Sequence, residues 1–177
     1  MILNQIADDI RHLILPRKSP WDDVRYSWIR NQRPTHKGQT GTWIVWKYFS
    51  DRNRVVRQSR SPQYDLLVDL DRVEVKLSCR NEDGSFKWLQ IRPSDDFTHL
   101  ALVAVDFDNI RGFLIPKDQI QGLKPQHLGH RGSMETTCLS VKPTEAWLRP
   151  YEIAVPPPPE PVAAPIRPTR RRATLWV

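Results

Sequence analysis

The stretch that decides the fold is residues 64–78, which read YDLLVDLDRVEVKLS. Apolar and charged residues alternate along both halves of it, and this period of two is typical of half-buried β-strands. The pattern predicts one strand over residues 64–69 and a second over residues 72–78, joined by a turn at Leu70 and Asp71. The stretch is therefore a β-hairpin, and the rest of the chain is organised around it.

Further strands follow the hairpin, and helical patterns precede it. The segments with strand character are residues 86–92, 99–107, 111–115 and 136–141. Residues 99–107 are almost wholly apolar, which predicts a strand in the middle of a sheet, covered on both faces. Helices are expected near the N-terminus, where apolar residues recur from Ile2 to Ile14, and over residues 40–52. Short helical turns are expected near residues 116–120 and 144–148. This order predicts an α/β domain with a mixed central β-sheet flanked by helices.

The composition changes near residue 154. The last 24 residues hold seven of the 16 prolines, and they carry a cluster of arginines at Arg170, Arg171 and Arg172. Proline lacks the backbone donor that helices and sheet interiors need. We therefore expect a folded domain over residues 1–153 and a disordered, proline-rich basic tail over residues 154–177. Its three clustered arginines would tether DNA without sequence preference or be an incidental basic end.

Overall composition narrows the class of protein. The 177 residues carry a formal net charge of +7, which fits a polyanionic partner such as nucleic acid. No apolar run approaches the roughly 18 residues of a membrane span, and the first residues lack the features of a signal peptide. Cys79 and Cys138 form neither a disulfide framework nor a metal-binding spacing. We expect a cytoplasmic protein with no membrane partner.

The predicted hairpin brings three charged residues together. With Leu70 and Asp71 as the loop, Asp65 lies opposite Lys76 and Leu67 opposite Glu74, so Asp65, Glu74 and Lys76 share one face. Two carboxylates and an ammonium group at this spacing suit a Mg²⁺ or Mn²⁺ ion and a water molecule. The same pattern also fits a solvated hairpin face with an ordinary ion pair between Asp65 and Lys76, although the surrounding residues are unusually apolar for that interpretation.

The residues around this face also resemble a known motif. Ser61-Pro62-Gln63-Tyr64-Asp65, then eight residues, then Glu74-Val75-Lys76, looks like the signature of the PD-(D/E)xK nuclease superfamily, the fold of many restriction endonucleases. Tyr64 stands where the motif often has proline. The resemblance extends over about residues 37–150, and it includes Gln90, in the strand where many members carry a supporting glutamine.

The resemblance implies Mg²⁺- or Mn²⁺-dependent hydrolysis of DNA phosphodiester bonds on a restriction-endonuclease-like fold. Asp65 and Glu74 would ligate the metal, and Lys76, with Gln90, would complete the catalytic set. Many members also carry a glutamate on the preceding helix, often just after a glycine. Here Thr42 follows the glycine and the helix has no acid, so the third ligand is unassigned, with Asp22 and Asp23 as candidates.

Clusters of basic residues are candidate DNA contacts. The stronger candidates are four arginines that lead into the motif: Arg52, Arg54, Arg57 and Arg60. A second basic stretch, from Arg30 to Lys37, would grip phosphates or be a solvated loop.

Three functions follow from the sequence. The first is a DNA endonuclease of the restriction, phage or repair type, in which cleavage of both strands of a duplex would favour a homodimer. The second is a non-catalytic nucleic-acid-binding module on a decayed nuclease fold. The third is an adaptor that binds other proteins through the proline-rich tail.

Overall fold

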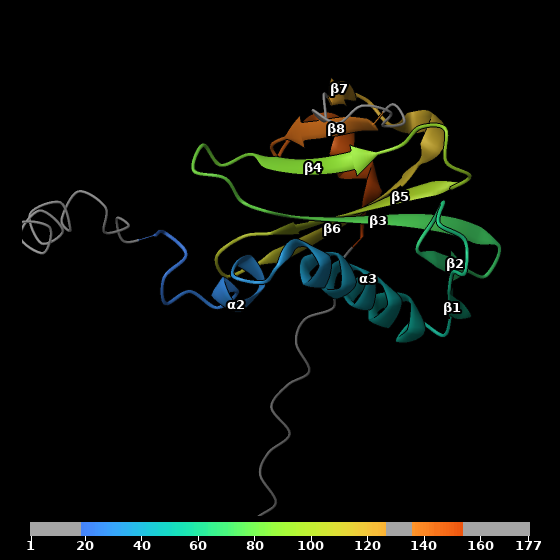
Figure 1. Cartoon of the computed structure of the whole chain (residues 1–177), viewed down its shortest axis with the longest axis horizontal. Coiled ribbons are helices and arrows are strands. Elements are labelled where there is room, and N and C mark those ends of the chain that lie inside the picture. Colours follow the sequence, from blue (N-terminus) through green and yellow to red (C-terminus); the bar gives the residue numbers. More distant parts are fainter. Residues whose placement is uncertain (1–18, 127–135, 154–177) are drawn as a thin grey trace, which may run out of the picture.

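The computed structural model describes residues 19–126 and 136–153. Two of the predicted segments lie outside these ranges: the N-terminal helix and the basic tail with Arg170, Arg171 and Arg172. In the described part of the chain, two helices precede a series of strands (Figure 1). These helices are α2 (Ser27–Arg30) and α3 (Pro34–Ser50). No helix within the described ranges is both long enough and apolar enough to cross a bilayer.

The larger of the two sheets has six strands in the order β1-β2-β3-β5-β6-β9. Its strands are β1 (Val56–Gln58), β2 (Leu66–Val68), β3 (Asp71–Cys79), β5 (His99–Val105), β6 (Ile110–Pro116) and β9 (Glu152–Ile153). β3 and β5 pair in parallel, whereas the other neighbours pair antiparallel. The mixed central sheet of an α/β domain is therefore confirmed.

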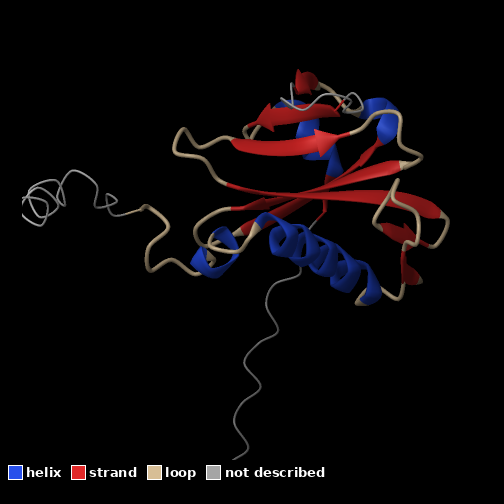
Figure 2. Cartoon of the chain, in the orientation of Figure 1, coloured by secondary structure: helices blue, strands red, loops and turns tan. Residues whose placement is uncertain are grey.

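A second, three-stranded sheet was not predicted. It has the order β4-β8-β7, with β4 at Phe86–Ile91, β8 at Thr136–Val141 and β7 at Lys124–Gln126. The expectation of a central sheet flanked by helices holds on one face, which α3 covers, while the second sheet lies over the other face (Figure 2). The buried side chains of Phe86, Trp88 and Ile91 explain this packing, since β4 directs them into a core that it shares with β5 and β6.

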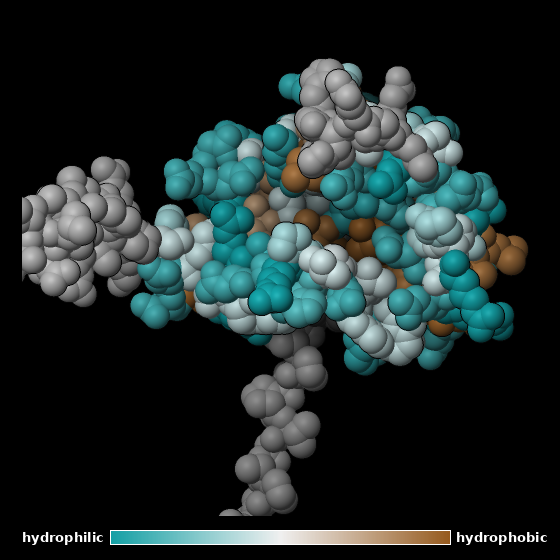
Figure 3. Space-filling model, viewed as in Figure 1, coloured by the Kyte–Doolittle hydropathy of each residue, from teal (hydrophilic) through white to brown (hydrophobic). Residues whose placement is uncertain are grey.

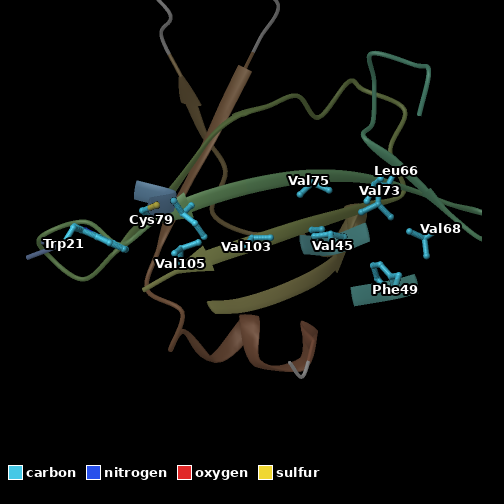
Figure 4. Packing of buried hydrophobic residues seen from close by; sticks show 12 residues of the cluster. Trp21, Val45, Phe49, Leu66, Val68, Val73, Val75, Cys79, Val103 and Val105 are labelled. Carbon is cyan, nitrogen blue, oxygen red and sulfur yellow. The ribbon is translucent and has the colours of Figure 1, made fainter. Parts of the chain in front are cut away.

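β5 lies between two hydrophobic cores. Its odd-numbered residues, such as Val103, pack on the α3 side with Val45, Phe49 and Val75 (Figure 4). Its even-numbered residues, such as Leu102, pack on the side of the second sheet. Side chains alternate between the faces of a strand, so an apolar residue at every position is what two covered faces require. The predicted central strand is therefore confirmed.

The shorter helical turns are 3₁₀ helices. They are η1 (Lys117–Gln119), directly after β6, and η2 (Ala146–Tyr151), which precedes β9. Both lie where a short helical turn was expected, and Leu148 of η2 is buried in the core beneath the second sheet.

Helix α3 begins six residues earlier than predicted and ends two residues earlier. Pro34 occupies its first turn, where a proline costs nothing because that backbone N–H would have no partner inside the helix. The helix presents Gly41, Val45 and Phe49 to the main sheet. At Gly41 the packing is close, since an added Cβ would lie 3.0 Å from Cβ of Leu77 on β3.

We expect Gly41→Val to lower the free energy of unfolding by about 1–3 kcal/mol, the usual cost of overpacking. Gly38→Val on the same helix is the matched control, because a Cβ at Gly38 meets nothing within 4 Å. That control should be neutral or slightly stabilising, since glycine is a poor helix former. Urea denaturation of both variants measures the difference, and equal stabilities would show that α3 does not depend on the contact with Leu77.

Candidate active site

The hairpin turn forms at Asp69 and Leu70, one residue earlier than predicted. Val68 pairs with Asp71 and Leu66 with Val73, so the predicted pairing of Asp65 with Lys76 is wrong by two residues. Asp69 adopts a left-handed backbone conformation, which aspartate tolerates better than most residues. Its side chain accepts a 2.9 Å hydrogen bond from the Val55 N–H and pairs with Arg54. These contacts from a distant segment select the turn.

The shift leaves the predicted face intact. Only a slip by an odd number of residues moves side chains to the opposite face of a sheet. β2 itself is shorter than predicted, and Asp65 lies just before it. Asp65 Oδ2 accepts a 2.8 Å hydrogen bond from the Val75 N–H, which fastens the carboxylate to the edge of β3. Lys76 Nζ lies 2.5 Å from Glu74 Oε1, so the partner of Lys76 is Glu74 and not Asp65, the partner in the alternative interpretation of this face.

Glu74 is the most buried member of this group, with 9% of its surface exposed. Burial raises the pKa of its carboxyl group, because water no longer solvates the charge; the ammonium group of Lys76 opposes this shift, and the negative charge of Asp65 adds to it. The three predicted residues are thus electrostatically coupled, with two carboxylates competing for one nearby cation. A divalent ion would relieve that repulsion.

The raised pKa of Glu74 predicts a pH effect on stability. The folded protein holds this proton more tightly than the unfolded chain does, so stability is gained as the pH falls through the folded-state pKa toward 4.5. We therefore compare the melting temperatures of the wild type and of Glu74→Gln in the presence of chelator. As the pH is lowered from 7 to 5, the melting temperature of the wild type should rise relative to that of the variant. Asp65→Asn should reduce this rise, since it removes one cause of the shift. A pH-independent difference would contradict the assignment.

A cleft of about 900 Å³ lies beside the charged group, between α3, the hairpin, β3 and β4. Asp65, Lys76 and Gln90 line it, whereas the buried Glu74 does not. Figure 3 looks onto this face, and hydrophobic side chains are visible at the bottom of the hollow, with α3 below and β4 above. Beyond Val73, the edge of β3 has no partner strand in the described ranges, because β2 is so short. Leu77 and Cys79 of that edge also line the cleft.

A β-bulge directs Gln90 into this cleft. The pairing of β4 with β8 shifts between Trp88 and Ile91, and Gln90 has a backbone φ of 56°. In a regular strand Gln90 would point into the core like Trp88, two residues before it. The bulge instead leaves Leu89 and Gln90 both exposed and returns Ile91 to the core. Such bulges often re-aim a side chain beside a functional site.

A third acidic ligand is not found where the sequence suggested. Neither Asp22 nor Asp23 lines the cleft. Thr42, which follows Gly41 where the nuclease motif often has glutamate, does line it. Asp95 is a carboxylate that sequence reasoning missed: its charge helps to raise the pKa of Glu74. Nevertheless, the described residues hold no group of three or more histidine, cysteine or acidic side chains arranged to bind a metal.

The four arginines before the motif do not line the cleft. Arg52 stacks over the ring of Tyr48, and Arg54 pairs with Asp69 at the hairpin turn. Arg57 and Arg60 are exposed outside the lining. Other cations occupy the cleft wall: Arg30 and Lys37, from the second basic stretch, and Lys87 from β4. Nothing in the sequence marked Lys87 except the alternation along β4, which puts its side chain on the face opposite to that of Trp88.

No known family profile matches the chain, and no curated protein sequence matches it either. The nuclease resemblance therefore stays a prediction, and the geometry of this cleft is the evidence that bears on function.

Proposed function

We propose that this protein is a metal-dependent DNA endonuclease with a restriction-endonuclease-like fold, which hydrolyses phosphodiester bonds. The observation that carries the proposal is the convergence of Asp65, Glu74 and Lys76, beside Gln90, at the edge of a cationic cleft. A solvated hairpin face would not bury Glu74 or couple it to a second carboxylate. Burial of a carboxyl group beside a second carboxylate costs free energy. Two acids and a lysine that stay together despite this cost favour a chemical role.

The donor set fits Mg²⁺ or Mn²⁺. Asp65 and Glu74 would hold the ion through carboxylate oxygens, and Mg²⁺ is commonly bound by one or two carboxylates together with water and substrate phosphate. When bound, the ion supplies Lewis-acid stabilisation and lowers the pKa of a coordinated water. A substrate phosphate would thus take the place of the third protein ligand.

The chain's own residues supply the remaining functions. The Lys76 ammonium group, which lies 2.5 Å from Glu74 Oε1, would donate hydrogen bonds to the attacking water or to a phosphate oxygen, where negative charge develops. Gln90 would orient the same water or the scissile phosphate through its amide. The backbone hydrogen bond from Val75 holds Asp65 in position throughout.

The test is a cleavage assay with purified protein on supercoiled plasmid, single-stranded DNA and branched DNA. We expect nicking in Mg²⁺ or Mn²⁺ and none after addition of chelator. The same ions should raise the melting temperature of the wild type by mass action, and Asp65→Asn should lose this increase. Size-exclusion chromatography with duplex DNA tests the proposed homodimer. If no substrate is cut and no ion shifts the melting temperature, the nuclease proposal is wrong.

The second candidate is a non-catalytic nucleic-acid-binding module. Two observations favour it: the described residues provide no third acidic ligand, and Lys76 already neutralises Glu74. This module would bind DNA equally well with and without divalent ions. The cleavage and melting assays separate it from the nuclease, because only the nuclease requires metal.

A further inference from the structure

Trp43 of α3 is unusually exposed for its size. It leaves 63% of its surface accessible, and it lines the cleft together with Trp46. The two rings meet edge to face with centroids 5.6 Å apart, an arrangement that steadies Trp43 without covering it. The opposite face of α3 is buried against the main sheet through Gly41 and Val45. Thus the fold holds the Trp43 indole on the cleft wall with most of its surface open to solvent.

The charge of the cleft points to a polyanion. The described lining residues include four cations, and Asp65 is the only acid among them. The cations are Arg30, Lys37, Lys76 and Lys87. They lie on both walls, since Lys37 comes from α3 and Lys87 from β4. A ligand that carries negative charge along its length and also offers flat apolar surfaces fits such a cleft, and a nucleic acid strand has both properties.

An aromatic side chain on a cleft wall discriminates between forms of DNA. In a duplex, neighbouring base pairs cover both faces of each base, so a protein ring reaches a base face only when that base is unstacked. Single strands offer these faces without that cost, and stacking of bases on aromatic side chains is how many proteins bind them.

We propose that the cleft binds a single, unpaired DNA strand and that Trp43 stacks on one of its bases. This inference rests on the proposed function and adds a substrate class to it: single-stranded DNA, or the unpaired region of a junction or flap. The cations on the two walls then contact the phosphates on either side of the stacked base. A strand bound in this way passes Asp65 and Lys76, which line the same cleft.

The binding test is done in chelator, so that no strand is cut. Fluorescence anisotropy measures the affinity of a labelled 12-nucleotide single strand, the same strand with abasic sites at its centre, and the corresponding duplex. We expect the intact single strand to bind most tightly. Trp43→Ala should weaken its binding by about 5- to 150-fold, the range that loss of one stacked base produces. Trp43→Phe should retain most of the affinity, because it keeps an aromatic face.

Trp28→Ala is the matched control. Trp28 is also exposed, at 55%, but it lies on α2 outside the cleft lining, so its loss should leave affinity unchanged. The abasic strand completes a double-mutant cycle: it should bind the wild type more weakly, whereas Trp43→Ala should not distinguish it from the intact strand. Three results would each overturn the proposal. The two tryptophan substitutions could have equal effects, the duplex could bind more tightly than the single strand, or poly-glutamate of the same charge could displace the DNA.

Two further arms complete the design. Tighter binding of the corresponding RNA strand would overturn the assignment to DNA. If Trp43→Ala binds the single strand as tightly as the wild type does, and the wild type cuts DNA in Mg²⁺, the stacking proposal is refuted and the nuclease proposal stands. Conversely, binding that depends on Trp43 without any cleavage would support stacking and refute the nuclease.

Discussion

Asp65→Asn, Glu74→Gln and Lys76→Ala should each lower the rate of Mg²⁺-dependent DNA cleavage by about 10²- to 10⁴-fold. These factors are typical for loss of a proton-transfer group or of a preorganised electrostatic contact. Asp65→Asn and Glu74→Gln each remove one of the two carboxylates that would hold the ion. Lys76→Ala removes the cation 2.5 Å from Glu74. Single-turnover cleavage at saturating protein measures the effect on the chemical step.

Two controls separate catalysis from folding and binding. Asp96→Asn removes an exposed carboxylate that pairs with Arg72 outside the cleft, and it should cut DNA at the wild-type rate. Without metal, Asp65→Asn should melt at or above the wild-type temperature, since it relieves repulsion with Glu74. If Lys76→Ala costs under about 1 kcal/mol of stability and leaves cleavage unchanged, the contact with Glu74 is only an ordinary ion pair.

Val103→Asp should prevent folding. Val103 is 2% exposed, in the middle of β5, and it packs in the core beneath α3. An unpaired buried charge costs at least about 3–5 kcal/mol, and the total stability of a domain is only about 5–15 kcal/mol. The measurement is the far-ultraviolet circular dichroism spectrum together with the thermal melt.

The control for this prediction is the same substitution at a surface valine. Val55 is exposed beside the hairpin, so Val55→Asp should change stability by about 1 kcal/mol or less. A Val103→Asp protein that melts cooperatively near the wild-type temperature would mean that β5 has one face open to water.

The sequence was most informative where alternation alone decides the structure. β5 was predictable because an unbroken apolar run has few alternatives to a central strand, and β3 because charged and apolar residues alternate along it. Asp65, Glu74 and Lys76 lie close together as expected although the hairpin register was wrong, because a slip of an even number of residues keeps the alternation of faces. The register itself depends on Asp69, which binds the Val55 backbone, and such a contact between separate segments leaves no local pattern.

The remaining errors have the same kind of cause. The alternation in β4 is equally compatible with a place in the main sheet or in a second one, and only packing of Trp88 against β5 decides between them. The arginines before the motif are adjacent to it in sequence, yet the chain turns them away from the cleft. Lys87 and Trp43 belong to the cleft through tertiary structure alone, so their roles were not visible from spacing.

The position of β5 between two cores also determines how the protein opens. Neither core can come apart without exposing one face of this strand, so the layers on its two sides should unfold together rather than one by one. The backbone amides of Leu102 and Val103 should then exchange their hydrogens with solvent only when the whole domain unfolds. Their exchange rates in deuterium oxide therefore report the global free energy of unfolding, while amides near the open edge of β3 exchange through smaller fluctuations.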